Sequence, residues 1–237
     1  MANTWFKFKQ FTIQQDKSAM KVGTDGVLLG AWTDTEGTKN ILDIGTGTGL
    51  LALMLAQRSS AIIDGVEIDI SASAQALDNI KKSPWFDRIR IFNLSFQEFI
   101  NTSKGDYDLI VSNPPYFIRS LKTPSSSRNL ARHDDKLSKN DLLGGVSKLL
   151  APEGTFAVIL PFDISGGLID LASEYGLYPK RIMKVRPAAG KMFNRTLLEV
   201  TRYHGKVSET ELTIETGGRK HYSDEYLRLT HEYYLDQ

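Results

Sequence analysis

The chain of 237 residues contains no cysteine. This absence excludes a disulfide framework and any metal site built on thiolates. No stretch approaches the roughly 20 apolar residues that a membrane-spanning helix needs. The first residues, MANTWFKFKQ, lack the apolar centre of a signal peptide. We therefore expect a cytoplasmic protein without membrane contact. Hydrophobic residues make up 41% of the chain, which is enough to form a full core.

The chain also has little net charge, +1 in all, but its cations are unevenly distributed. Residues 119–148 hold seven Lys and Arg against three Asp and Glu, and residues 180–206 hold eight against one. The segments that follow, 149–179 and 207–237, are acidic. Two concentrated basic blocks fit a nucleic-acid partner, although an ordinary solvated surface gives the same pattern.

Short runs rich in Ile, Val and Leu alternate with helix-like segments, a pattern typical of a parallel sheet with helices on both faces. The sequence predicts strands at 40–45, 61–67, 89–93, 107–112 and 155–160. It predicts helices at 49–58, 71–82, 138–149 and 163–175. Two further strands, YPKRIMKVRP and TLLEVTRYH, are joined by a loop too short for a parallel crossover. We expect this last pair to be antiparallel.

A glycine-rich turn follows the first predicted strand in ILDIGTGTGLLALMLAQ, residues 41–57. Gly45, Gly47 and Gly49 permit a tight turn and the close approach of a ligand at the N-terminus of a helix. The spacing G-x-G-x-G differs from the dinucleotide fingerprint G-x-G-x-x-G, which disfavours NAD. Asp43, inside the strand, offers a carboxylate that can pair with an ammonium group of a ligand.

The second strand ends at Glu67, about 20 residues beyond the glycines, where a carboxylate can accept hydrogen bonds from both hydroxyls of a ribose. Asp69 is expected to cap the next helix. Phe96, after the third strand, is a candidate to cover an adenine ring, with a place in the core as the alternative. A nucleoside that carries an amino acid and no pyrophosphate is S-adenosylmethionine, so this set of residues predicts a site for that methyl donor.

The stretch YDLIVSNPPYF, residues 107–117, ends a buried strand in Asn113, Pro114, Pro115 and Tyr116. An exocyclic or amide nitrogen is a weak nucleophile because its lone pair is delocalised. The Asn113 side-chain oxygen and the Pro114 carbonyl can each accept one N–H and so direct the lone pair toward a methyl donor. The prolines hold this loop rigid, and Tyr116 can stack on a flat substrate. An ordinary Pro-Pro turn is the alternative.

The glycine loop, Asp43 and Glu67 together resemble the class I methyltransferases. The quartet Asn113 to Tyr116 resembles the (Asn/Asp/Ser)-Pro-Pro-(Tyr/Phe) motif of members that methylate planar nitrogens. The resemblance implies a Rossmann-like α/β fold with a seven-stranded, mostly parallel sheet, an antiparallel last strand and helices on both faces. The quartet itself does not distinguish adenine, guanine and the amide of glutamine as substrates.

Three other stretches narrow the resemblance: FKFKQFTIQQDKSAMKVGTDGVLLGAW at 6–32, ARHDDKLS at 131–138 and YSDEYLRLTHEYYL at 222–235. They are similar to bacterial tRNA adenine-N6 methyltransferases that modify the adenosine beside the anticodon of a valine tRNA. The resemblance implies methyl transfer from S-adenosylmethionine to that adenosine. Its alternatives are a guanine-N2 methyltransferase of ribosomal RNA, a protein-glutamine methyltransferase and a catalytically silent RNA-binding subunit.

The resemblance spans the whole chain as one methyltransferase domain, with an N-terminal segment at 1–39, a catalytic core at 40–205 and a C-terminal extension at 206–237. It implies that the donor pocket is also lined by Lys21, Gly23, Thr24 and Asp25. A helix that begins at Thr24 is compatible with this role. We expect a monomer without a metal.

The resemblance to tRNA methyltransferases implies a function for the two basic blocks. Cations at the mouth of the pocket can bind tRNA phosphates without reading sequence. The candidates are Arg119, Lys122, Arg128, Arg132, Lys191 and Arg195. At the adenine end of the donor, Ser95 stands where many relatives have an acid that holds the adenine amine, and this departure leaves the adenine contacts open.

Overall fold

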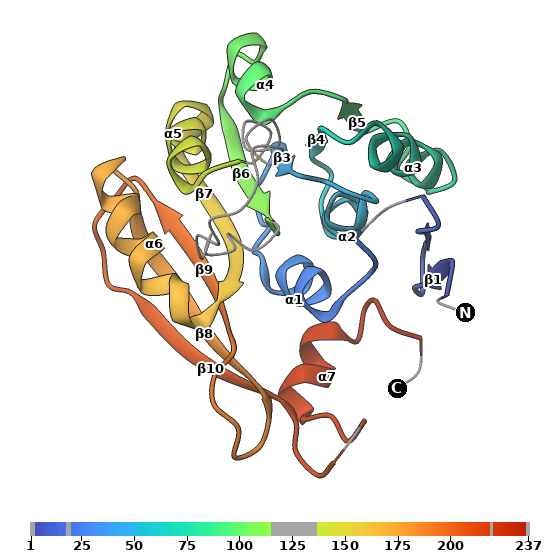
Figure 1. The fold of residues 1–237 in the computed structure, drawn as a ribbon, viewed down its shortest axis with the longest axis vertical. Coiled ribbons are helices and arrows are strands. Elements are labelled where there is room, and N and C mark those ends of the chain that lie inside the picture. The colour runs from blue at the N-terminus through green and yellow to red at the C-terminus, as the bar shows by residue number, and fades with distance from the viewer. Residues whose placement is uncertain (1–2, 18–19, 115–136, 219, 236–237) are drawn as a thin grey trace, which may run out of the picture.

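The computed structural model describes residues 3–17, 20–114, 137–218 and 220–235 (Figure 1). The strands, in chain order, are β1 (Trp5–Lys7), β2 (Thr12–Gln14), β3 (Asn40–Ile44), β4 (Ile62–Val66), β5 (Ile89–Phe92), β6 (Tyr107–Ser112), β7 (Leu150–Pro161), β8 (Tyr178–Ala188), β9 (Arg195–Thr201) and β10 (Ser208–Glu215). The helices are α1 (Thr24–Trp32), α2 (Leu50–Arg58), α3 (Ile70–Lys81), α4 (Phe96–Thr102), α5 (Lys139–Leu149), α6 (Phe162–Glu174) and α7 (Asp224–Thr230). None of the helices in these ranges has the length and apolar content needed to cross a membrane.

One large sheet of eight strands, in the order β10-β8-β9-β7-β6-β3-β4-β5, forms the centre of the molecule. Helices α1, α2, α3 and α7 pack on one face, and α4, α5 and α6 pack on the other (Figure 1). The central strands are buried on both faces because their successive side chains alternate between two cores. Ile41 and Leu109 point into one core, whereas Leu42 and Ile110 point into the other. The predicted α/β architecture is confirmed.

Strands β8, β9 and β10 form the last part of the sheet. The direction of β9 agrees with the prediction, but the number of strands in the sheet does not. Strand β9 is antiparallel to both β7 and β8, as predicted for the short connection between β8 and β9. An eighth strand, β10, then adds to the edge of the sheet parallel to β8, where seven strands were expected. Strand β10 comes from the segment 206–237, which the sequence had separated from the core. Charged side chains hold it there: Lys184 pairs with Glu209 at 2.9 Å, and Arg186 pairs with Glu211.

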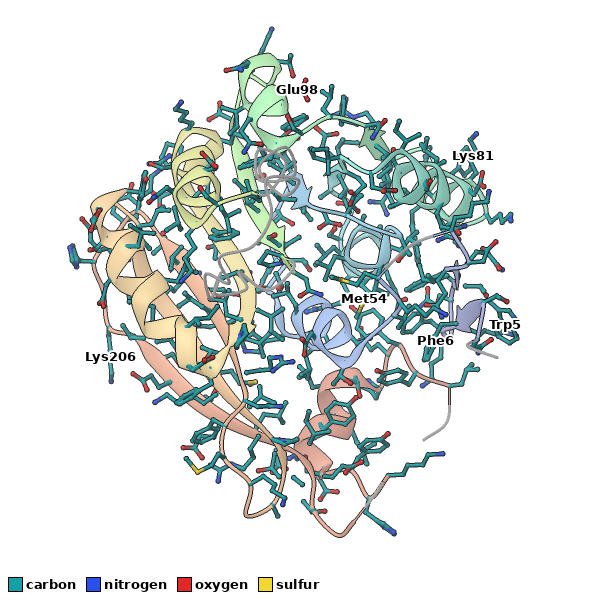
Figure 2. The ribbon with its side chains drawn as sticks, in the orientation of Figure 1. Trp5, Phe6, Met54, Lys81, Glu98 and Lys206 are labelled. Carbon is teal, nitrogen blue, oxygen red and sulfur yellow. The ribbon has the colours of Figure 1, made fainter. Side chains whose placement is uncertain are left out.

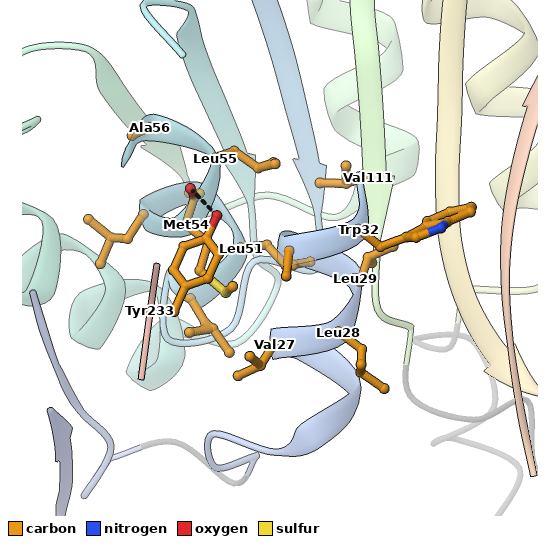
Figure 3. Packing of buried hydrophobic residues seen from close by; sticks show 14 of the residues in the cluster. Val27, Leu28, Leu29, Trp32, Leu51, Met54, Leu55, Ala56, Val111 and Tyr233 are labelled. Carbon is orange, nitrogen blue, oxygen red and sulfur yellow. Dashed lines mark hydrogen bonds between the residues drawn. The ribbon is translucent and has the colours of Figure 1, made fainter. Parts of the chain in front are cut away.

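Helix α1 lies in the middle of one core and is apolar around most of its circumference. Its residues Val27, Leu28 and Leu29 are fully buried, as expected for a helix without a polar face. Met54 of α2 lies beside it near the centre of the molecule, while Lys206 and Glu98 point outward at the rim (Figure 2). Figure 3 shows the hydroxyl of Tyr233 donating to the backbone oxygen of Met54, which ties the C-terminal segment to α2.

The carboxyl ends of β3, β4 and β6 lie side by side, since these three parallel strands are direct neighbours. The loops that follow them carry the predicted site residues Gly45, Gly47, Gly49, Glu67, Asn113 and Pro114. Ser112, at the end of β6, donates its hydroxyl to the backbone oxygen of Ile44 at 2.9 Å and so fixes the end of β6 against the end of β3. This edge of the sheet is the place where ligands bind in open α/β sheets.

Candidate active site

A cavity of about 400 Å³ opens at this edge. It is bounded by the start of α1, by the glycine loop between β3 and α2, and by the residues that follow β6. Its lining includes nine of the predicted site residues: Lys21, Gly23, Thr24, Asp25, Gly45, Gly47, Asn113, Pro114 and Arg195. Segments that are far apart in the sequence are therefore brought to one cavity. Asp43, Gly49, Glu67, Phe96 and Lys191 do not line it.

The glycine loop has a backbone that only glycine adopts without strain. Gly45, Gly47 and Gly49 have φ angles of 72°, 57° and 83°, in the left-handed region that disfavours other residues. The amides of Gly45 and Thr46 donate to the backbone oxygen of Val66. Gly49 then precedes the first residue of α2. The loop therefore turns tightly at the N-terminus of a helix, as predicted.

Glu67 follows β4 and holds the glycine loop through its carboxylate. One oxygen accepts the amide of Gly47 at 2.9 Å, and the other accepts the amide of Asp69 at 2.9 Å. Asn93 donates to the backbone oxygens of Glu67 and Ile68, which fixes the loop from the side of β5. Asp69 caps α3 by accepting the amide of Ala72, as predicted. Glu67 is thus a half-buried carboxylate with fixed geometry beside the glycine loop.

Asp43 is fully buried in β3, behind the glycine loop. Burial raises the pKa of its carboxyl from 3.8 to about 7, opposed by the hydrogen bond from Thr46 and more weakly by the amide of Ala52, while the nearby charge of Glu67 adds to the rise. The Thr46 hydroxyl donates to Oδ2 at 2.6 Å. The other oxygen, Oδ1, is buried without a well-formed hydrogen bond among the described residues. A buried carboxylate with an unused oxygen can accept a cationic group.

Phe96 does not reach the cavity. Its ring is 5% exposed and belongs to the core under α4 and α5, where it lies against Gly145. The core alternative for Phe96 therefore holds, and covering an adenine ring does not fit this position. Ser95 begins α4 instead: it accepts the amide of Glu98, whose side chain in turn accepts the amide of Ser95. The exposed apolar side chain beside Glu67 is Ile68, at 51% exposure, which is not among the predicted site residues.

The start of α1 is positioned by two buried polar side chains. Gln15 accepts the amide of Val22 at 2.8 Å, which holds the segment before α1. Asn79 of α3 bonds both backbone groups of Gln14 and donates to the backbone oxygen of Thr48. One side chain thus links the N-terminal segment to the glycine loop. Helix α1 begins at Thr24, as the sequence predicts.

Asn113 is half-buried directly after β6 and is followed by the buried Pro114. Gly26 of α1 faces it: a Cβ at Gly26 would lie 3.7 Å from the Asn113 amide nitrogen and 2.9 Å from Leu50. Helix α1 therefore approaches Asn113 closely because position 26 has no side chain. The remaining members of the quartet, Pro115 and Tyr116, lie outside the described residues.

Several cations of the second basic block, residues 180–206, form ion pairs in the folded protein. Arg119, Lys122, Arg128 and Arg132 lie outside the described residues. In the second block, Arg195 pairs with Asp25 at 2.9 Å across the cavity, and three more of its cations have carboxylate partners: Arg181, Lys184 and Arg186. Lys191 is exposed in the turn between β8 and β9. Glu199, the partner of Arg181, is already counted within the block, so the three contacts of Lys184, Arg186 and Arg195 with other segments reduce the charge of +7 for residues 180–206 to +4.

Known proteins similar to this chain are methyltransferases. A family model described as the methyltransferase small domain matches residues 18–140. A tRNA1(Val) (adenine(37)-N6)-methyltransferase of Bacteroides fragilis is 53% identical over 99% of both chains, and one of Parabacteroides distasonis is 52% identical over 99% of both. The chain belongs to the tRNA1(Val) (adenine(37)-N6)-methyltransferase family. The predicted family membership is confirmed.

The fold of this methyltransferase is also found in solved structures. A predicted O-methyltransferase from Agrobacterium tumefaciens superposes with a TM-score of 0.68 at 17% identity, covering 88% of this chain and 96% of the other. Similarity at this level concerns the fold alone. It confirms the class I methyltransferase fold, to which β10 is an addition at the sheet edge.

Proposed function

We propose that this chain transfers a methyl group from S-adenosylmethionine to the N6 amine of adenosine 37 in a valine tRNA. The observation that carries the proposal is that Asn113 and Pro114 line the same cavity as the glycine loop. A pair of acceptors for an amine then faces a site suited to a methyl donor. The names of the full-length relatives supply the position and the tRNA.

The residues around the cavity fit S-adenosylmethionine. A cavity of about 400 Å³ lies in the range of small-molecule sites, about 300–1,000 Å³. Asp43 and Glu67 do not line the cavity, but both hold the glycine loop that does, through Thr46 and Gly47. Their negative charge directly behind this loop suits the ammonium group of the donor at Asp43 and the ribose hydroxyls at Glu67. Ile68 is an exposed apolar side chain next to Glu67 that can pack on the adenine ring. When bound, the donor supplies an electrophilic methyl group on a positively charged sulfur.

Asn113 and Pro114 would perform the orienting step. The side-chain oxygen of Asn113 and the backbone oxygen of Pro114 accept the two N–H groups of the substrate amine. This arrangement leaves the nitrogen lone pair directed away from both acceptors, toward the donor side of the cavity. The N–C bond forms as the bond from carbon to sulfur breaks. The methylated nitrogen is then a strong acid and loses one proton to solvent, so no separate base is needed before transfer.

The substrate class can be tested by offering the protein three substrates with labelled donor: unmodified bacterial tRNA, ribosomal RNA and a protein extract. We expect label in tRNA, recovered as N6-methyladenosine by nucleoside mass spectrometry. Label recovered as N2-methylguanosine from ribosomal RNA, or as methylglutamine from protein, would replace the tRNA assignment by one of the alternatives. Absence of label, with donor bound in calorimetry, would indicate a silent binding subunit.

A further inference from the structure

The turn between β8 and β9, residues 189–194, projects from the edge of the sheet that carries the cavity. Strands β7 and β8 run in the same direction because both are antiparallel to β9. The end of β8 therefore lies at the same edge as the ends of β3 and β6. In Figure 1 this turn is the orange loop at the lower end of the sheet, near α7. Arg195, the first residue after the turn, lines the cavity.

Met192 lies within this turn and is 83% exposed, the highest exposure among the large apolar side chains that the structure describes. A long unbranched apolar side chain held almost entirely in water is unfavourable for the isolated protein. It does not belong to either core cluster. Met192 stands three positions before Arg195, which lines the cavity, so its exposed side chain is available to a molecule that covers the cavity mouth.

Packing and hydrogen bonds hold the base of the turn in place, so the backbone that carries Met192 has a fixed position. The ring of Phe193 packs against the ring of Phe162 with centroids 5.4 Å apart, and the guanidinium of Arg186 lies 4.1 Å from the Phe193 ring centroid. The Asn194 amide donates to Val185. On the cavity side, Arg195 pairs with Asp25 of α1.

The chemistry of the turn fits nucleic acid. Lys191 is exposed directly before Met192, so a cation suited to a phosphate lies beside an apolar side chain suited to a base. Proteins that unstack nucleic acid use apolar side chains, methionine among them, as wedges between bases. A wedge is useful here because an adenine stacked in a loop cannot bring its N6 amine to Asn113 inside the cavity.

We propose that Met192 inserts into the base stack of the anticodon loop, in the space left by the target adenosine, while Lys191 contacts a neighbouring phosphate. This proposal rests on the proposed tRNA methylation and adds the means by which the target base is extruded. Met192 is then a positioning residue, because it acts on the neighbours of the reacting base and not on the reacting atoms.

The test uses a valine anticodon stem-loop in which 2-aminopurine replaces the target adenosine. The fluorescence of 2-aminopurine rises when the base leaves the stack, and without an N6 amine it is not methylated. We compare the wild type with Met192→Ala and Met192→Leu. The matched control is Phe86→Ala, which removes an apolar side chain of 63% exposure from the turn before β5, at the opposite edge of the sheet.

We expect the wild type, Met192→Leu and Phe86→Ala to raise the fluorescence on saturation with the stem-loop. Met192→Ala should bind the stem-loop but lose most of the rise, and its kcat on the adenosine-containing tRNA should fall about tenfold, because unstacking is then unsupported. Donor affinity, measured by calorimetry, should be unchanged in all variants.

An unchanged fluorescence rise and kcat in Met192→Ala would overturn the wedge, and so would a loss in Met192→Leu equal to that in Met192→Ala, because apolar bulk would then not be the property that matters. Failure of the proposed function has a different signature: the wild type itself would not methylate the tRNA.

Discussion

Burial of the Asp43 carboxylate lowers the stability of the folded protein, although the same carboxylate is proposed to hold the ammonium group of the donor. Its pKa is raised from 3.8 to about 7 by burial, so the folded protein holds a proton there that the unfolded chain has released. The stability associated with this group is complete below about pH 4 and is lost as the pH rises through 7. We predict that Asp43→Asn raises the free energy of unfolding above wild type at pH 8. The shift sets an upper limit on the order of 4 kcal/mol, measured by urea unfolding without donor.

The gain from Asp43→Asn should shrink as the pH falls from 8 to 4, which separates this electrostatic effect from one of packing. Asp87→Asn, in the exposed turn before β5, is the control and should follow the wild-type curve. A difference between Asp43→Asn and wild type that is the same at both pH values would contradict the account. Because the same carboxylate is proposed to hold the donor's ammonium, the stabilised variant should bind the donor more weakly.

At the scale of elements, the packing of α1 against the site depends on Gly26. A Cβ there would lie 2.9 Å from Leu50 and 3.7 Å from the Asn113 amide nitrogen. Alanine favours a helix over glycine by about 1 kcal/mol, which offsets part of the crowding. We predict that Gly26→Ala changes the free energy of unfolding little, within about 1 kcal/mol, but lowers methyl transfer about tenfold, because both crowded side chains line the cavity.

Gly166→Ala is the matched control for Gly26→Ala. Gly166 is also in a helix, α6, but an added Cβ would meet nothing within 4 Å. We expect this substitution to raise the free energy of unfolding by about 0.5–1 kcal/mol and to leave transfer unchanged. If Gly26→Ala behaved in the same way, the spacing between α1 and Asn113 would not matter for the reaction.

The elements also indicate what the sequence could predict. Strands β3 to β6 follow apolar runs, and their predicted bounds are confirmed to within one residue, whereas β7 begins at Leu150, five residues before its predicted start. Helix α4 was missed although its capping box, Ser95 and Glu98, is visible in the sequence. Strand β10 was missed because it is an edge strand with one fully buried side chain, Leu212, and so has no apolar run.

The cavity was predicted in the same way, from local signals. The glycine loop and the Asn113–Pro114 pair depend on adjacent residues, and the structure brings them together. The pair of Arg195 with Asp25 joins residues 170 positions apart, and no local pattern indicates it. Charge counted along the chain overestimated the free cations in 180–206, because the partners of Lys184 and Arg186 are in β10.

At the scale of the whole molecule, the C-terminal segment is part of the core. Tyr233 is 1% exposed and its hydroxyl donates to the backbone oxygen of Met54 at 3.2 Å (Figure 3). We predict that Tyr233→Ala lowers the free energy of unfolding by about 3–5 kcal/mol, and Tyr233→Phe by about 1 kcal/mol, in urea unfolding. Tyr203→Ala, which changes a tyrosine of 52% exposure, should change it far less. A loss below 1 kcal/mol for Tyr233→Ala would show that this segment is not needed for stability.

The proposed methyl transfer depends on Asn113, which orients an adenine amine of tRNA beside the bound methyl donor. The most direct measurement is single-turnover methyl transfer to unmodified valine tRNA by the wild type and by Asn113→Ala, with donor affinity measured in parallel. We predict N6-methyladenosine from the wild type and a rate at least about a hundredfold lower in the variant, with donor affinity changed only a few-fold. Transfer by Asn113→Ala at the wild-type rate would contradict the account.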